Sequence, residues 1–586
     1  MRTFDLLFGR ALATSEERAE QIGPAAGLPI FGLDALSSAA YGPEAALTLL
    51  LPLGIAGVQH IVPVIMAIII LLVIVYFSYR QTIEAYPHGG GSYTVASENL
   101  GARPGLLAAA ALMIDYILTA AVGISAGVGA LISAVPSLHQ HTLSICLGIL
   151  LLLTLINLRG ARDTGIAFLI PTYLFLGTLL VVIIWGFVRI AVHGGHPVPV
   201  AAPPALPPAT AALTTWLMLK VFASGCTAMT GVEAVSNGVM AFRTPTTKNA
   251  KTTLTIIIAF LIVLLAGIAL LCRAYNIGAT DPGSSAYQSV LSQLTAAVMG
   301  KGVFYYVTIG SILLVLSLSA NTAFADFPRL TRSIAKQDYL PHVFILRGRR
   351  LLYSHGIFAL VVFTAALLIL FGGVTDRLIP LYAIGAFLAF TLSQAGMVVH
   401  WYRKGNSIGR MIVNGVGAVA TGITLLVVLV AKFVEGAWVT AILIPALIVV
   451  MSLVRRHYEH TAQETAAPEP LSVAGLCPPR VILPVDKWNR VTEQGLRFAL
   501  AMSPEVQVVH VDFGDEDRSN INQIWNELVL APIKAAGLAE PQLVMIRSPY
   551  RFFAQPLVDH VLAEQKKHCD RQIAVVVPEL VVQHWY

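Results

Sequence analysis

Acids are rare in the long apolar stretches of the chain, and Asp34, Asp115 and Glu233 lie inside such stretches. An acid at the centre of a membrane-spanning helix costs about 2.5 kcal/mol or more, so such residues usually face a cavity and mark an ion or proton path. At any single position a structural, hydrogen-bonded acid is the alternative. The three acids together favour a path for a cation or a proton.

Oxygen-bearing neighbours accompany each acid at helical spacing. Residues three, four or seven positions apart share one face of a helix. Carboxylate, hydroxyl and phenol oxygens, together with the carbonyls of an interrupted helix, can replace the hydration shell of an alkali cation. For a single Thr or Tyr, a hydrogen bond back to its own helix is an equal alternative. The pairs at these spacings are Asp34 and Tyr41, Asp115 and Thr119, Tyr116 and Thr119, and Thr230 and Glu233.

Glu233 has a second candidate role, as a proton carrier. Burial disfavours the charged form of a carboxylate, so an acid inside a membrane can bind and release a proton during transport. Asp115 is a candidate for the same role, and residue types alone do not decide between the two.

The composition that surrounds these residues is that of a membrane protein. The chain has 586 residues, of which 56% are hydrophobic and only 12% charged. Soluble proteins carry about 25% charged residues, so a soluble enzyme is excluded. The net charge of +6 does not indicate binding to a nucleic acid polymer, because the basic residues flank apolar stretches, as membrane topology requires. No HExxH motif is present, so we expect neither an enzyme nor a resident cofactor.

Twelve apolar stretches are long enough to cross a hydrocarbon core, which takes about 20 residues each. Only helices satisfy their backbone in lipid without closing into a barrel, so we predict an all-α polytopic fold with 12 transmembrane helices. The loops on one side hold 21 Lys and Arg and those on the other side hold five, which predicts cytoplasmic N- and C-termini. The stretches are 28–52, 59–79, 104–134, 141–157, 165–192, 213–242, 252–272, 303–326, 355–372, 376–400, 411–431 and 436–454.

Two of these stretches are interrupted by small and polar residues. The first contains FGLDALSSAAYGP (31–43) and the sixth contains SGCTAMTGVEAVSNG (224–238). They lie five stretches apart, so equivalent helices of two consecutive five-helix units would have opposite topology. Paired broken helices in corresponding positions indicate a transporter site near the membrane midplane.

The last part of the chain has ordinary soluble composition. Short β-branched runs at 480–486, 506–513, 542–548 and 573–577 alternate with helical periodicity, which predicts a parallel α/β sheet. The predicted organisation is a cytoplasmic N-terminal segment 1–27, a transport domain 28–456, a linker 457–470 and a cytosolic regulatory domain 471–586.

At these residues the sequence resembles a known family. The segments LPIFGLDALSSAAYGPEAAL (28–47), DYILTAAVGISAG (115–127) and FASGCTAMTGVEAVSNG (222–238) are similar to those of the KimA-type potassium importers, within the amino acid–polyamine–organocation superfamily. The resemblance covers essentially the whole chain, including RVILPVDKWNRV in the tail.

This resemblance implies a LeuT-like fold, with a 5+5 inverted repeat and broken helices 1 and 6, in a multi-pass protein of the cell membrane. It also implies proton-coupled potassium uptake, a homodimer, and a cytosolic domain similar to universal stress proteins that binds cyclic di-AMP. Glu233 is the implied candidate proton carrier. The implied cation-binding residues are Asp34, Tyr41, Asp115, Tyr116, Thr119, Thr230 and Tyr382.

The chain departs from the family pattern at two places. Gly123 stands where the potassium importers carry a serine that can face the ion, so we expect one ligand to be lost or replaced by water or a carbonyl. The chain also stops at HWY (584–586), where relatives usually continue, so the regulatory domain is expected to be incomplete.

Two other functions stay open. An amino-acid permease needs free backbone N–H groups for the substrate carboxylate, whereas Asp34 in the first break would repel a carboxylate and attract a cation. A polyamine would tolerate this acid. A membrane sensor of nutrients or nucleotides would use the tail, but it would not need three acids in its spans.

Replacing either of two acids tests the predicted site. We expect Asp34→Asn and Asp115→Asn to abolish potassium uptake while the protein still folds and inserts, because each substitution removes a charged cation ligand. Uptake is measured in vesicles, with folding checked by gel filtration. Wild-type flux from either variant would contradict the assignment.

Overall fold

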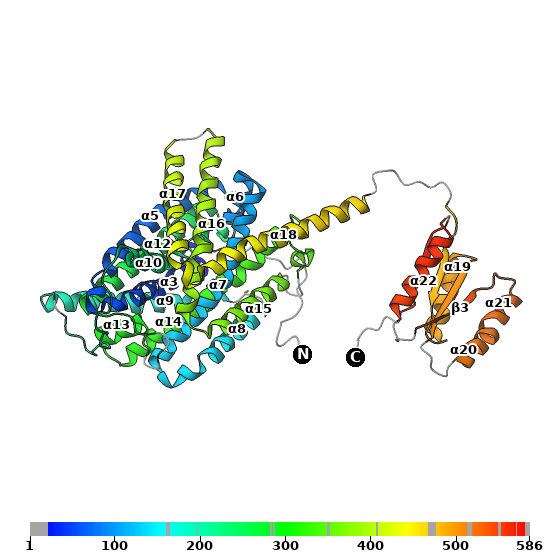
Figure 1. Cartoon of the computed structure of the whole chain (residues 1–586), viewed down its shortest axis with the longest axis horizontal. Helices are drawn as coiled ribbons and strands as arrows, with labels where there is room; N and C mark the ends of the chain where they lie inside the picture. Colours follow the sequence, from blue (N-terminus) through cyan, green and yellow to red (C-terminus); the bar gives the residue numbers. More distant parts are fainter. Residues whose placement is uncertain are drawn as a thin grey trace. The chain divides into compact units, whose positions relative to one another are not determined.

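The computed structural model describes residues 22–159, 164–195, 197–281, 284, 287–347, 352–405, 408–466, 476–512, 518–548, 553–569 and 571–579. The chain forms two compact units, residues 1–465 and 466–586, both drawn in Figure 1. Most of the predicted segment 1–27, residues 467–470 of the predicted linker and the terminal HWY lie outside the described residues.

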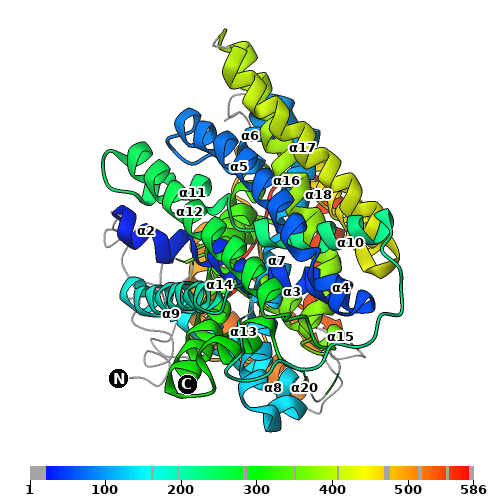
Figure 2. The same cartoon turned by 90° about the vertical axis from the view of Figure 1, so that its left-hand side faces the viewer.

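The first unit is a bundle of apolar helices, seen from two directions in Figures 1 and 2. In the described part of the chain, nine helical stretches are long and apolar enough to cross a membrane. Their backbone hydrogen bonds are made within each helix, as a hydrocarbon environment requires. The stretches are Ile55–Ala85, Ala102–Ala134, Pro136–Arg159, Phe168–Val192, Thr246–Ala274, Val303–Ala335, Ser354–Phe371, Thr375–Arg403 and Ile408–Thr465.

The remaining predicted stretches differ from single helices in two ways. The two interrupted ones are divided into shorter helices. The last two, predicted at 411–431 and 436–454, lie within the single helical run Ile408–Thr465. This run consists of α17 (Ile408–Lys432), the π-helical turn η8 (Phe433–Ala437) and α18 (Trp438–Thr465), with a kink at Gly436. Residues 457–465 of the predicted linker are therefore helical.

The other elements of this unit connect or flank the two interrupted stretches. The long helices are α5 (Ile61–Ala85), α7 (Ala102–Ala134), α8 (Thr142–Arg159), α9 (Thr164–Val192), α12 (Thr246–Ala274), α14 (Val303–Ala335), α15 (Ser354–Phe371) and α16 (Thr375–Arg403). The shorter elements are η2 (Leu51–Leu53), α4 (Ile55–Val58), α6 (Ser92–Leu100), η3 (Pro136–His141), η6 (Val239–Ala241), α13 (Val290–Met299) and η7 (His342–Ile345).

The first interruption is a kink at one glycine. Helix α2 (Pro24–Phe31) ends where α3 (Leu33–Leu50) begins, and Gly32 lies between them. The Gly32 N–H still donates to the carbonyl of Leu28, at 2.9 Å, so hydrogen bonding continues across the kink. Asp34 therefore lies in the first turn of α3.

The second interruption is a true unwinding. Helix α10 (Thr215–Gly225) passes into the short 3-10 helix η5 (Cys226–Met229), and helix α11 (Ala234–Asn237) resumes after four residues. Within the gap, Thr230 has an extended backbone and Gly231 has φ +79°, a conformation that side-chain-bearing residues rarely adopt. Unwound backbone at membrane depth is tolerated where it is buried in protein or lines a cavity.

The second unit is the predicted parallel α/β domain. Its four strands are all parallel, in the order β3-β2-β1-β4. Val481, Leu483 and Val508 form its core with Trp525. Helix α19 begins after Asn489, whose side chain accepts from the N–H groups of two following residues. The elements are β1 (Arg480–Pro484), α19 (Arg490–Met502), β2 (Val506–Asp512), α20 (Arg518–Ile524), η9 (Trp525–Leu530), α21 (Ala531–Ala535), β3 (Gln542–Arg547), α22 (Ala554–Lys567) and β4 (Ile573–Val575).

A buried carboxylate joins helix α22 to strand β1 of this domain. Glu564 on α22 lies 3.2 Å from Arg480 on β1 and accepts from Lys567 at 3.0 Å. The hydrogen bond from Lys567, followed by the charge of Arg480, lowers the pKa of Glu564 below its ordinary value. The acid therefore stays ionised at neutral pH and pairs with both bases.

Adding one methyl group at Gly231 tests the unwound segment. A Cβ there would lie 2.6 Å from Asp34 Oδ2 and 2.7 Å from the Ala35 nitrogen, and the backbone has positive φ. We expect Gly231→Ala to destabilise the protein by about 1–3 kcal/mol, measured as a lower unfolding temperature in detergent.

The matched control is Gly148→Ala in helix α8, where a Cβ would meet no atom within 4 Å. Alanine is favoured over glycine inside a helix, so this variant should be neutral or slightly stabilised. Equal unfolding temperatures for the two variants would contradict the packing described at Gly231.

Candidate functional site

The two interrupted stretches meet side by side in the interior of the helical unit. Ser38 on α3 donates its hydroxyl hydrogen to the carbonyl of Ala228 in η5, at 2.6 Å. One turn further along α3, the Tyr41 hydroxyl lies 3.1 Å from Thr230 Oγ1. The next residue, Gly231, packs directly against the carboxylate of Asp34. Asp34, Tyr41 and Thr230 are distant in the sequence and thus lie close together in the structure.

Helices α7 and α16 form the opposite wall. Thr119 Oγ1 on α7 lies 2.9 Å from the hydroxyl of Tyr382 on α16. The Tyr382 and Tyr41 rings have centroids 6.5 Å apart, so the two hydroxyl pairs are neighbours. Close approach of the two helices depends on Gly385, where a Cβ would lie 3.2 Å from the Cβ of Asp115. Asp115 therefore faces the interface between α7 and α16.

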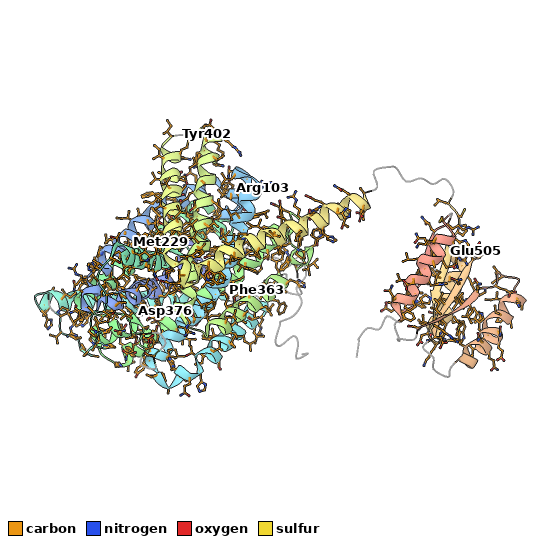
Figure 3. All side chains as sticks on the ribbon, in the orientation of Figure 1. Arg103, Met229, Phe363, Asp376, Tyr402 and Glu505 are labelled. Carbon is orange, nitrogen blue, oxygen red and sulfur yellow. The ribbon has the colours of Figure 1, made fainter. Side chains whose placement is uncertain are left out.

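All eight predicted site residues are closed off from the surface. None has more than 6% of its area exposed, and Tyr382 has none. Met229, labelled in Figure 3 at the end of η5, is equally buried. A site in this place is occluded from both sides of the bundle, which is the arrangement needed to hold an ion away from water.

Two carboxylate oxygens in this interior lack a hydrogen-bond partner. They are Asp115 Oδ1 and Glu233 Oε2, each fully shielded from solvent. Buried polar atoms normally have partners, and a buried charge without one is strongly unfavourable. A bound cation or a proton on the acid would remove this cost. The two oxygens are therefore the strongest structural indication of what the site holds.

Tyr116 belongs to a separate hydrogen-bonded group on the same helix. Its hydroxyl accepts from Asn237 Nδ2 at 3.0 Å, and Asn237 also lies 3.3 Å from Asp326 Oδ2. The Asn237 Oδ1 atom is buried without a partner. The structure thus places Tyr116 toward α11 and α14, whereas Thr119 faces the tyrosine pair.

The glycine-rich loop at 89–91 packs against the same short helix α11. The Gly90 N–H donates to the carbonyl of Ser236 at 3.1 Å, and a Cβ at Gly91 would lie 2.7 Å from Asn237 Oδ1. The GGGS run, which superficially resembles a phosphate-binding loop, is therefore a packed loop that supports the second half of the unwound helix.

Gly123 faces helix α14. A Cβ at this position would lie 2.6 Å from Ser319 Oγ and 2.8 Å from the carbonyl oxygen of Leu316. Any side chain here must first displace α14. The expected loss of a ligand at this position is thus accompanied by a closer contact between α7 and α14, which small residues allow in membranes.

Sequence reasoning missed three buried charged residues in the bundle. Glu44 on α3 is 8% exposed and lies within the first predicted stretch, so the rule that identified the other acids could have found it. Asp326 closes the predicted stretch 303–326. Lys432 is 2% exposed, and its Nζ donates to Ser224 Oγ at 2.9 Å. Lys432 directly follows the predicted stretch 411–431, so the sequence predicts that it lies in a loop.

Two family models match separate parts of the chain. A model described as "Amino acid permease" matches residues 35–454, and one described as "KimA potassium transporter C-terminal domain" matches residues 478–586. The chain is also 36% identical over 591 aligned positions to a protein named potassium transporter KimA from Bacillus subtilis (strain 168). This alignment covers 99% of the chain and 93% of that relative.

Removing one phenol oxygen tests the tyrosine pair. Interactions of a polar group with a charge contribute about 1.5–3 kcal/mol, and 1.4 kcal/mol is a factor of ten in affinity. We expect Tyr41→Phe and Tyr382→Phe each to raise the potassium concentration for half-maximal uptake about tenfold or more. The control is Tyr93→Phe, which loses a hydrogen bond of 2.8 Å to Gln337 outside the site. Equal potassium concentrations for half-maximal uptake in all three variants would contradict a role for Tyr41 and Tyr382 in binding the ion.

Proposed function

Because the chain belongs to the amino acid permease family and, within it, to the KimA potassium transporters, we propose that it imports potassium together with protons. One observation carries the proposal: Asp115 Oδ1 and Glu233 Oε2 are buried without partners in an interior lined by hydroxyl and phenol oxygens. An alkali cation prefers oxygen ligands of these kinds, and a buried acid can take up a proton.

The proposed roles follow the chemistry of each residue. Glu233 carries the proton, because it borders the unwound segment and its Oε2 atom has no partner. The helix break places the Thr230 hydroxyl beside Tyr41. Six predicted residues are proposed to hold potassium directly: Asp34, Tyr41, Asp115, Thr119, Thr230 and Tyr382. Tyr116, the seventh predicted ligand, is proposed to join them by releasing its hydrogen bond with Asn237.

The proposed architecture is twelve transmembrane helices in a LeuT-like 5+5 inverted repeat. Nine helical stretches qualify as spans by length and composition in the described part. Counting the two interrupted stretches as spans and dividing Ile408–Thr465 at its kink gives twelve. Both termini are proposed to be cytoplasmic, in the cell membrane, because most Lys and Arg lie in loops on that side.

A permease for amino acids is the main rival, since the matching family model carries that name. Against it, Asp34 lies in the first turn of α3, with its carboxylate against Gly231. Negative charge there opposes binding of a substrate carboxylate. A polyamine has no carboxylate and is the rival that uptake assays must exclude. A sensor without net transport would show nucleotide binding and no ion flux.

The tail unit is proposed to regulate transport. Support comes from the match of residues 478–586 to the KimA C-terminal domain model and from its parallel α/β sheet. We propose that it is similar to universal stress proteins, that it binds cyclic di-AMP as an inhibitory ligand, and that the transporter is a homodimer. No resident cofactor is proposed.

Uptake into proteoliposomes tests this function. With an inward proton gradient, we expect saturable potassium uptake accompanied by acidification of the vesicle interior. Without the gradient, uptake should slow, because the proton supplies part of the driving force. Glu233→Gln should separate the two fluxes, retaining potassium binding while losing the response to pH.

Potassium uptake that is independent of the proton gradient would contradict coupling. Transport of an amino acid or polyamine with no potassium flux would favour the rival permease. Binding of cyclic di-AMP is measured on the same full-length protein, and the ligand should reduce uptake.

A further inference from the structure

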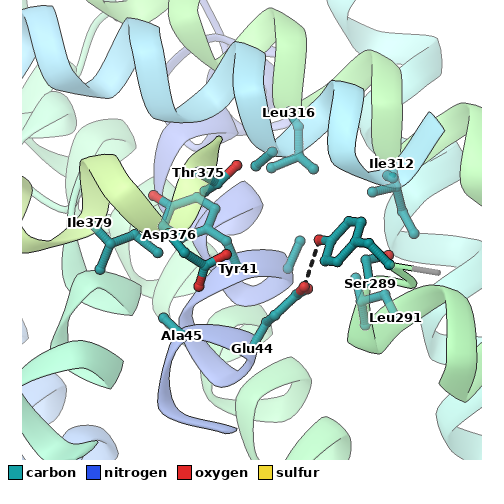
Figure 4. A pocket seen from close by; sticks show the side chains of 14 residues that line it. Tyr41, Glu44, Ala45, Ser289, Leu291, Ile312, Leu316, Thr375, Asp376 and Ile379 are labelled. Atoms are coloured by element: carbon teal, nitrogen blue, oxygen red, sulfur yellow. Dashed lines mark hydrogen bonds between the residues drawn. The ribbon is translucent and has the colours of Figure 1, made fainter. Parts of the chain in front are cut away.

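A small cavity lies next to Tyr41, beyond the residues assigned to cation binding. Its volume is about 20 Å³, enough for about one water molecule. Figure 4 shows Tyr41, Glu44 and Asp376 converging on it from α3 and α16. Glu44 follows Tyr41 by three residues, so both side chains lie on one face of α3. The cavity therefore continues the pathway from Tyr41 toward one end of the bundle.

A larger cavity of about 260 Å³ continues in the same direction. It is lined by His139 and Gln140 between α7 and α8, and by the turn that precedes α16. The two cavities share three lining residues: Tyr287, Thr375 and Asp376. A route from the loops at this end to Tyr41 thus passes between Tyr287 and the start of α16.

The contact at this junction is a hydrogen bond between α3 and the segment before α13. The Tyr287 hydroxyl donates to Glu44 Oε1 at 2.6 Å, drawn as the dashed line in Figure 4. Glu44 Oε2 accepts from the backbone N–H of Val290, the first residue of α13, at 3.1 Å. Glu44 forms no salt bridge with any residue that the structure describes. Both of its carboxylate oxygens accept hydrogen bonds from a segment outside α3.

We infer that the hydrogen bond from Tyr287 to Glu44 is a gate that closes the ion pathway at this end. The inference rests on the proposed function, which supplies the cation that must pass. When Tyr287 moves away, the two cavities join, and the freed oxygen of Glu44 faces the entering cation. When Tyr287 returns, the hydrogen bond satisfies Glu44 again and separates Tyr41 from the outer cavity. Tyr287 and Glu44 are therefore positioning residues of the gate.

Thiol labelling tests the gate directly. In a background with the five native cysteines replaced, Ala45→Cys places a thiol on the inner cavity and Gln140→Cys places one at the mouth of the outer cavity. The probe is a small, membrane-impermeant cationic methanethiosulfonate. We expect Tyr287→Phe to increase labelling of the inner thiol about tenfold, the shift expected when one hydrogen bond to a charged group is lost. Labelling at Gln140→Cys should not change.

Tyr305→Phe is the matched control, because Tyr305 is also buried. Its hydroxyl lies 2.7 Å from the hydroxyl of Ser292 on α13, and both residues lie outside the two cavities. This variant should leave labelling of the inner thiol unchanged. Glu44→Gln is a second test, because its single amide oxygen can accept from only one of the two donors, the Tyr287 hydroxyl or the Val290 N–H, and it should also speed labelling. Normal labelling at the mouth shows that each variant is folded.

Unchanged labelling of the inner thiol in both Tyr287→Phe and Glu44→Gln would overturn the gate. The parent protein's potassium uptake is measured in the same vesicles. Faster labelling without any uptake by the parent would overturn the proposed function and support the gate. Normal uptake with unchanged labelling would leave the function standing and overturn the gate.

Discussion

The structure depends on how the unwound segment after η5 is held against helix α3. Backbone groups in a hydrocarbon environment must be satisfied within the protein. Here Ser38 donates to the carbonyl of Ala228, Tyr41 contacts Thr230, and Gly231 fits directly over Asp34 because it has no side chain. The short helix α11 is supported in turn by the loop at 89–91. These contacts allow an irregular backbone to persist deep in an apolar bundle.

Placing the unwound segment there has an electrostatic consequence. It brings carboxylates from three different elements into an interior from which water is excluded, and two of their oxygens lack partners in the protein. A charge in such a place needs a counter-charge, a proton or hydrogen-bond donors. The proposed coupling of a cation to a proton rests on this feature, since each can neutralise the same acids.

Much of this could be predicted from residue types and depth along the chain. Acids in apolar stretches identified Asp34, Asp115 and Glu233, and the small and polar residues at 31–43 and 224–238 indicated where two helices are interrupted. The alternation of strands and helices predicted the parallel sheet of the tail. These features depend on local patterns of hydrophobicity and residue spacing, which can be recognised in the sequence alone.

Other features depend on contacts between distant segments and could not be predicted locally. The first break is only a kink, because hydrogen bonding continues past Gly32. Gly123 faces Ser319, since the rotation of α7 is set by its packing against α14. Glu44 and Asp326 are satisfied by Tyr287 and Asn237, which lie far away in the sequence.

The most direct test of the account is to locate a heavy monovalent cation in the protein. Thallium(I) resembles potassium in charge and size and scatters strongly, so its position can be found by anomalous diffraction or cryo-electron microscopy. We expect thallium density in contact with Asp115 Oδ1, between Tyr41 and Tyr382, and its loss in Asp115→Asn. Density that lies elsewhere in the bundle, or that persists unchanged in this variant, would contradict the account.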